Sequence, residues 1–429
     1  EERQFTALKK ENAGIENVKA VNRCFSVIEC TIFKKMKEDK KGFLKKVVDI
    51  VMLSMFVLGL FLMCFLSNKA SHGNPKESAE AAITKELSYD PLYSKQWYLQ
   101  DSVKNVVVPS NPTDDPDFIM EDIILNSTIN IGVDDFWKCY QEDNGKELVI
   151  AILDSCVDIH HEDLESAIWK NEAEIPDNGI DDDHNGYIDD FYGWNFYSDS
   201  PAVYDDGEEA AHGTHCAGIL AAAHNGVGTM GILGNTNVKL MVVPIYGGEE
   251  LEADDLVSAI RYADDMGADI CNISCVFQDG GDKISKAMDQ SDMYFVVASG
   301  NFQSQYINGL NLEEYRRFPA CCKNKRVITV GSINERSEWS HFSNYSPAFV
   351  DIAAPGEYIY STLPGDGYGF ESGTSASAPI VTGILSAYYY CYADTVEEAA
   401  ELLLSNAQPN MGLMEKASQG RIVRFLQKH

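Results

Sequence analysis

Basic side chains are scarce in this 429-residue chain. It holds 34 Lys and Arg against 66 Asp and Glu, which gives a formal net charge of −32. Residues 1–67 carry 12 basic and 8 acidic side chains, and this leaves 22 basic and 58 acidic residues for the rest. Such an acidic domain repels nucleic acid and anionic membrane surfaces. The charge therefore excludes nucleic acid as a partner and favours either solubility with cation binding or the selection of basic substrates.

Internal repeats are absent, and the eleven cysteines have no regular spacing. Regularly spaced cysteines are typical of small disulfide-stapled domains, a class that this chain does not resemble. Eight cysteines follow Cys64, an even number that leaves disulfides open as an alternative. Several of them stand inside motifs that look buried, so we predict mostly free thiols that behave as small apolar groups.

One long uncharged run stands near the N-terminus. Residues 50–66 read IVMLSMFVLGLFLMCFL, and a helix of about 20 residues spans a bilayer core. Seven lysines precede the run between residues 34 and 46, whereas the flank after it is poor in Lys and Arg. The positive-inside rule then predicts a single-pass membrane protein with a cytoplasmic N-terminus and an extracytoplasmic main domain. A cleaved signal peptide is the competing interpretation, but the run is long for one and begins far from the N-terminus.

The sequence that follows the apolar run predicts one large domain. We expect a cytoplasmic segment at 1–46, a transmembrane anchor at 47–67, a polar linker at 68–89 and a globular domain at 90–429. Within this domain, short runs that are apolar on both faces alternate with helical patterns, which predicts an α/β fold with a mostly parallel central sheet between two helix layers. The expected strands are 148–153, 239–245, 269–274, 294–299, 326–332 and 349–354, and the expected helices are 213–223, 255–267, 375–390 and 395–406.

Three polar residues stand where such a fold gathers function. Asp154 ends an apolar strand in AILDSC, and functional groups cluster beyond the carboxyl ends of parallel strands. His212 opens the small-residue helix HGTHCAGILAA, and Ser375 begins a helix in ESGTSASAP. Taken alone, Asp154 fits a turn and Ser375 an N-cap. Together they supply a nucleophile, a base and a carboxylate that orients the base, and the free N–H groups of the helix start can face an oxyanion.

The chain order Asp, His, Ser is that of subtilisin. In these motifs the chain resembles the subtilisin-like (subtilase) serine protease family, over about residues 90–429. The resemblance implies a subtilisin-like three-layer fold for this domain, to which the apolar run at 50–66 adds one predicted N-terminal transmembrane helix. It also implies a serine endopeptidase that acts on proteins or peptides without an organic cofactor, and the predicted anchor makes it a membrane-anchored one. Its catalytic triad is then Asp154, His212 and Ser375.

Further segments extend the resemblance to the oxyanion hole and the substrate groove. The turn in FVVASGNF (295–302) resembles the family turn whose Asn donates to the oxyanion, which implies that role for Asn301. Two positions depart from the family, because Cys156 and Val276 replace glycines and Val276 should narrow the specificity pocket. These departures leave two alternatives open: a catalytically impaired subtilase-fold binding protein, or a processing peptidase of narrow specificity. The substrate-binding residues implied by the resemblance are Gly247, Ser274, Val276, Ser299 and Gly300.

An acidic loop predicts a structural Ca²⁺ site. Residues 181–186 fit the first half of an EF-hand loop, D-x-D-x-N-G, but Tyr192 occupies the position of the bidentate Glu. The loop is therefore not a regular EF-hand. Packed carboxylates repel one another without a cation, so we predict Ca²⁺, and a solvated acidic loop is the alternative. The predicted ligands are Asp181, Asp183, Asn185, Tyr187 through its carbonyl, and Asp190.

Overall fold

The computed structural model describes residues 89–108, 123–140, 145–205, 207–247, 252–302, 304 and 308–427. The predicted cytoplasmic segment, the predicted anchor at 47–67 and almost all of the predicted linker lie outside these residues. Within the described ranges, no helix combines the length and the apolar character that crossing a membrane requires.

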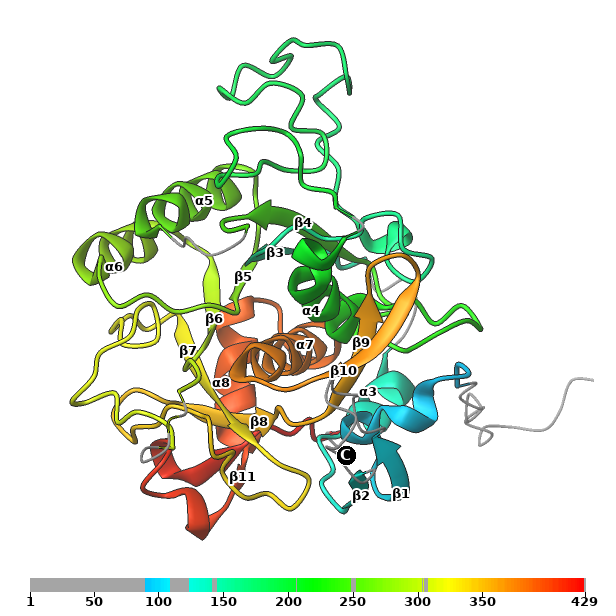
Figure 1. Cartoon of the computed structure of the whole chain (residues 1–429), viewed down its shortest axis with the longest axis vertical. Helices are drawn as coiled ribbons and strands as arrows, with labels where there is room; N and C mark the ends of the chain where they lie inside the picture. The colour runs from blue at the N-terminus through cyan, green and yellow to red at the C-terminus, as the bar shows by residue number, and fades with distance from the viewer. Residues whose placement is uncertain are drawn as a thin grey trace, which may run out of the picture. The chain divides into compact units, whose positions relative to one another are not determined.

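An eight-stranded sheet forms the centre of the domain (Figure 1). Its order is β11-β12-β8-β7-β6-β5-β3-β4, and every neighbouring pair is parallel except β11 with β12. This confirms the predicted mostly parallel sheet. The strands are β3 (Leu148–Asp154), β4 (Val238–Pro244), β5 (Ile270–Ile273), β6 (Tyr294–Ala298), β7 (Val327–Ile333), β8 (Ile352–Pro355), β11 (Gln408–Pro409) and β12 (Arg421–Ile422).

Helices cover both faces of the sheet because successive side chains of a strand point to opposite faces. On β3, Ile150 and Ile152 join one apolar core, whereas Ala151 and Leu153 join a second one. The first core packs against α4 (Ala211–Ala221), α7 (Thr374–Tyr392) and α8 (Val396–Asn406), and the second against α5 (Ala253–Asp265) and α6 (Gly281–Gln290). Figure 1 shows α5 beside α6, apart from α4 and α7.

A hairpin of β9 (Ile359–Leu363) and β10 (Gly367–Glu371) packs closely on α4. The Thr362 hydroxyl donates to the Thr214 carbonyl at 2.8 Å, and a Cβ at Gly218 would lie 2.1 Å from Thr362 Oγ1. The small residues of α4 are therefore needed for this approach. β10 leads within a few residues into α7, so the hairpin also positions the start of that helix.

Smaller elements complete the described residues. A second antiparallel hairpin pairs β1 (Val103–Val108) with β2 (Ile123–Ser127), and α3 (Val133–Cys139) follows it. Six 3₁₀ turns connect elements within the described ranges: η1 (Tyr93–Lys95), η2 (Trp97–Leu99), η3 (Glu165–Ala167), η4 (Glu208–Ala210), η5 (Met411–Leu413) and η6 (Ser418–Gly420).

Candidate active site

Asp154 and His212 form a directly bonded pair at the carboxyl edge of the sheet. Asp154 is the last residue of β3 and is fully buried, and its Oδ1 accepts the Nδ1 proton of His212 at 2.6 Å. The backbone N–H of Gly213 donates to Ser155 Oγ at 3.0 Å and so ties the start of α4 to the end of β3. The strand and the helix together fix the direction of the imidazole ring.

The pair is ionic in character. Burial by itself favours a protonated Asp154, but the attraction of His212 and the hydrogen bonds from Ser155 and Tyr246 outweigh it and hold the pKa of Asp154 below its usual value. Burial by itself also lowers the pKa of His212, yet the Asp154 carboxylate outweighs it and raises the pKa of the ring. Asp154 therefore keeps its charge and stabilises an imidazolium, which is the state that a general base must reach.

Ser375 is the second residue of α7, and its backbone is connected to this pair through Cys216. Its carbonyl accepts the Ser274 hydroxyl at 3.0 Å and the Cys216 thiol at 3.5 Å. The same Cys216 Sγ, a carboxylate oxygen of Asp154 and a ring nitrogen of His212 all lie within 4.8 Å of one another. Cys216 thus links the start of α7 to the Asp154–His212 pair, and three segments that are distant in the sequence meet at one place.

The amide of Asn301 is held in one orientation. Its Oδ1 accepts both the backbone N–H of Thr374, at 3.0 Å, and the Thr374 hydroxyl, at 2.9 Å. The Nδ2 group therefore faces the other way. A Cβ at Gly373 would lie 2.7 Å from Ser375 Oγ and 3.1 Å from Asn301 Nδ2, so both polar groups face this glycine and leave no room for a side chain there.

The other predicted substrate-binding residues each contact different neighbours. Gly300 has φ of +88°, and a Cβ there would lie 2.7 Å from Val276 Cγ2, so the valine methyl groups fill the space next to this glycine. The hydroxyl of Ser299 donates to the Asn344 carbonyl at 3.0 Å and is buried, which indicates a structural role for that side chain. Gly247 lies against the ring of Tyr197.

All eight cysteines among the described residues are free thiols, as predicted. The Cys156 side chain turns toward the loop 195–202, where its Sγ is 3.7 Å from the Ala202 carbonyl and accepts a hydrogen bond from Asn195 at 3.5 Å. The side chain of Cys156, which stands where the family has glycine, is thus accommodated by that loop.

The acidic loop brings together part of the predicted ligand set and one residue that the motif did not include. Asp183, Asp190 and Glu174 offer carboxylate oxygens that lie within 4.8 Å of one another. Glu174 is buried, and its Oε2 has no hydrogen-bond partner among the described residues. Asn185 donates to Asp183 and Asp190, which indicates that its amide nitrogen faces the group.

Two further predicted ligands, Asp181 and Tyr187, make contacts within the loop and with its neighbours. Asp181 closes the turn, since its two carboxylate oxygens accept the backbone N–H groups of Asn185 and Gly186 at 3.1 and 3.0 Å. The ring of Tyr187 packs against Trp194 and Tyr262. The carboxylate cluster shares Asp183 and Asp190 with the predicted ligand set and adds Glu174.

A further residue at the catalytic pair was missed from the sequence. The Tyr246 hydroxyl donates to Asp154 Oδ1 at 3.0 Å and lies 2.9 Å from His212 Nδ1. Tyr246 follows the end of β4 by two residues, and β4 pairs with β3 such that Pro244 lies opposite Asp154. Only this register, which no local motif encodes, reveals the contact.

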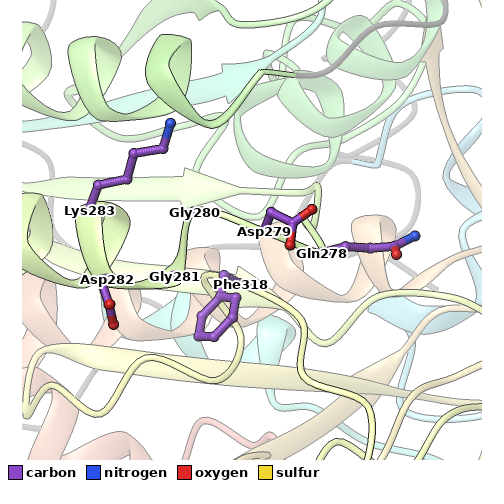
Figure 2. A pocket seen from close by; sticks show the side chains of 7 residues that line it. All are labelled: Gln278, Asp279, Gly280, Gly281, Asp282, Lys283 and Phe318. Carbon is purple, nitrogen blue, oxygen red and sulfur yellow. The ribbon is translucent and has the colours of Figure 1, made fainter.

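A pocket of about 420 Å³ lies apart from these residues, between the start of α6 and the ring of Phe318 (Figure 2). The Phe318 ring leaves no room for a side chain at Gly281, where a Cβ would lie 2.4 Å from Cζ. None of the predicted catalytic, metal or substrate residues lines this pocket. Its lining residues are Gln278, Asp279, Gly280, Gly281, Asp282, Lys283 and Phe318.

Comparison with known proteins gives consistent matches. The chain is 30% identical over 255 residues to subtilisin-like protease 1 of Plasmodium falciparum (isolate 3D7), and this alignment covers 55% of this chain and 36% of that protein. It is 31% identical over 247 residues to the major intracellular serine protease of Bacillus subtilis (strain 168), and this alignment covers 56% of this chain and 68% of that protein. The match thus spans little more than a third of the Plasmodium relative.

Solved structures share the fold. A cold-adapted subtilisin-like serine proteinase superposes with a TM-score of 0.51 at 21% identity, over 68% of this chain and 93% of the other. A protease from Pseudoalteromonas arctica superposes with a TM-score of 0.55 at 21% identity, over 78% of this chain and 96% of the other. The profile of the subtilase family matches residues 145–422, which is most of the chain, and the chain therefore belongs to the subtilase family.

Proposed function

We propose that this chain is a serine endopeptidase that hydrolyses peptide bonds through Asp154, His212 and Ser375. Ser375 Oγ attacks the peptide carbonyl carbon while His212 takes its proton, and Asp154 stabilises the imidazolium. The Asn301 amide and the Ser375 backbone N–H hold the oxyanion. His212 then protonates the leaving amine, and water repeats the sequence to release the acid. The observation that carries this proposal is the 2.6 Å Asp154–His212 contact next to the start of α7.

The test is hydrolysis by the full chain, with fluorescent casein and a peptide library as substrates. We expect turnover that vanishes in Ser375→Ala, and a folded wild-type protein that cleaves neither substrate contradicts the proposal. In that event the catalytically impaired binding protein is the reading that remains.

A narrow-specificity processing peptidase is the second candidate, favoured by the Val276 methyl groups against Gly300. Such an enzyme cleaves a few library peptides efficiently and casein poorly. Val276→Gly should then admit larger side chains and raise the number of cleaved peptides. An unchanged cleavage profile in Val276→Gly counts against this candidate.

Activity should rise with pH through a range above that of an ordinary histidine. His212 must be neutral to accept the serine proton, and Asp154 raises its pKa despite the opposing effect of burial. The acid limb of kcat/KM is therefore expected above about pH 6.5, the unperturbed value. The measurement is a pH–rate profile with a constant-ionic-strength buffer series. A midpoint below pH 6.5 is incompatible with this electrostatic account.

We also propose that Asp183, Asp190 and Glu174 hold a structural Ca²⁺. Carboxylate oxygens are the hard ligands that this cation prefers, one of the three groups (Glu174) has a buried oxygen without a partner among the described residues, and the cation removes their mutual repulsion. Chelation should lower the thermal midpoint by about 5 °C or more, which is the loss expected when a cation present at a concentration well above its Kd is removed. Glu174→Gln should shrink that difference, whereas the exposed control Asp292→Asn should leave it intact. A midpoint that ignores both chelator and Ca²⁺ contradicts the site.

We further propose that residues 47–67 anchor the chain as a single-pass membrane protein with the protease domain outside the cytoplasm. The uncharged run and the lysines before it support this topology. A reporter fused to the C-terminus should be active on the extracytoplasmic side. A reporter that is active only in the cytoplasm contradicts the topology.

A further inference from the structure

One oxygen of Asp154 receives three hydrogen bonds. Its Oδ1 accepts the backbone N–H of Ser155 at 2.7 Å, His212 Nδ1–H at 2.6 Å and the Tyr246 hydroxyl at 3.0 Å. The other oxygen, Oδ2, is buried and has no hydrogen-bond partner among the described residues. The tyrosine thus competes with the histidine for the same atom.

The fold places Tyr246 there by strand register. β3 and β4 run parallel, with Asp154 opposite Pro244, and the Ile245 N–H donates to the Asp154 carbonyl at 2.9 Å. This bond continues the pairing by one residue beyond the strand, and the next residue is Tyr246. Its ring packs against the second apolar core, so the hydroxyl is delivered to the carboxylate by a well-anchored side chain.

The direction of the hydroxyl proton follows from the state of the histidine. His212 Nδ1 carries a proton in the neutral ring that serves as the base, and it also does so in the imidazolium. A protonated Nδ1 cannot accept a hydrogen bond, although it lies 2.9 Å from the Tyr246 oxygen. The hydroxyl proton therefore points to Asp154 in both states, and burial beside this carboxylate raises the pKa of Tyr246, which keeps it a donor.

We propose that Tyr246 is a positioning residue for the catalytic pair, one that acts through Asp154 Oδ1 to set the basicity of His212. This inference rests on the proposed serine protease function. By donating to Oδ1, the hydroxyl takes up part of the negative charge that Asp154 otherwise directs at the imidazolium. Tyr246 thus keeps His212 less basic and leaves more of it in the neutral, reactive form at a given pH.

Other titratable groups also face the pair. Burial raises the pKa of the Cys216 and Cys275 thiols, so both stay neutral, and burial lowers the pKa of His215. The Glu371 carboxylate of β10 adds a negative charge that also favours the imidazolium. Tyr246→Phe leaves all four groups in place, so a difference between the variant and the wild-type chain reports the hydroxyl alone.

The test is the titration of His212 in the full chain and in Tyr246→Phe, followed by NMR of labelled histidine rings and assigned by the signal that His212→Ala lacks. We expect the variant to titrate about one pH unit higher, because one hydrogen bond to a charged group is lost. The acid limb of kcat/KM should move by the same amount. On that limb the rate falls about tenfold, whereas KM and the alkaline plateau change little.

The matched control is Tyr388→Phe, which removes a buried hydroxyl that donates to the Arg424 carbonyl, outside the site. It should lower the thermal midpoint without moving either titration. A Tyr246→Phe titration that is unchanged, or that moves to lower pH, overturns the inference. The NMR titration does not depend on turnover, so it tests Tyr246 even if the wild-type chain proves inactive, and that inactivity would count only against the proposed function.

Discussion

His212→Ala should lower kcat by about 10⁶-fold, the loss that removal of the equivalent base produces in subtilisin. The 2.6 Å contact with Asp154 orients this ring, and the proposed function makes it the base for Ser375. Without it, the serine hydroxyl keeps its proton and attacks at a negligible rate. KM should change little, because the ring acts on the proton rather than on substrate binding. The measurement is steady-state hydrolysis of the best library peptide.

His160→Ala is the control for the general effect of losing an imidazole. His160 is exposed, with its ring against Tyr204, and it belongs to none of the contacts of the catalytic pair. It should retain near wild-type rates. Without the base, only oxyanion stabilisation and substrate binding still accelerate the reaction, and the rate they supply lies far below that of the wild-type enzyme. A His212→Ala variant whose kcat stays within about 100-fold of wild type therefore contradicts the assignment of the base.

Asn301→Ala should lower kcat by about 10²–10³-fold, as expected when one oxyanion donor is removed from a serine protease. The structure separates the two ends of this amide. Its oxygen holds Thr374, and its Nδ2 borders the space beside Gly373 and Ser375 Oγ. The loss should appear in kcat with KM nearly unchanged, because the donor meets a full negative charge only in the transition state.

Thr374→Val is the matched control for this second variant. It removes two bonds of the hydroxyl, the one donated to Asn301 Oδ1 and the one accepted from the Gly300 N–H at 3.1 Å, but it keeps the backbone bond of Thr374 and the Nδ2 donor. We expect kcat to fall less than about tenfold because the Nδ2 donor remains, whereas the two lost bonds should lower the thermal midpoint. If Thr374→Val is as impaired as Asn301→Ala, the amide serves to order the start of α7 rather than to hold an oxyanion.

The sequence predicted those features that a single segment encodes. The six expected strands lie within a few residues of β3 to β8, because strands buried on both faces give continuous apolar runs. Asp154 stands at a strand end, and His212 and Ser375 stand at helix starts, so local patterns were sufficient to find them. The chemistry of the three residue types then indicated one site.

Contacts that depend on strand pairing or on the folding of a loop could not be predicted from the sequence. Tyr246 reaches Asp154 only because β4 lies next to β3, and Glu174 joins Asp183 and Asp190 only through the folding of the acidic loop. The EF-hand spacing predicts a ligand role for Asp181, and in the structure its carboxylate also accepts two backbone N–H groups of the turn. The spacing gave the location of an acidic site, and the hydrogen bonds of the folded loop decide which oxygens remain for a cation.

The most direct test of the central claim is to label the full chain with a fluorophosphonate and identify the modified residue by peptide mapping. An activated serine beside a general base reacts with such a probe, whereas ordinary serines do not. We predict a single adduct on Ser375 that is absent from Ser375→Ala and strongly reduced in His212→Ala. A folded chain that takes up no probe, or one that is labelled at another residue, contradicts the proposed triad.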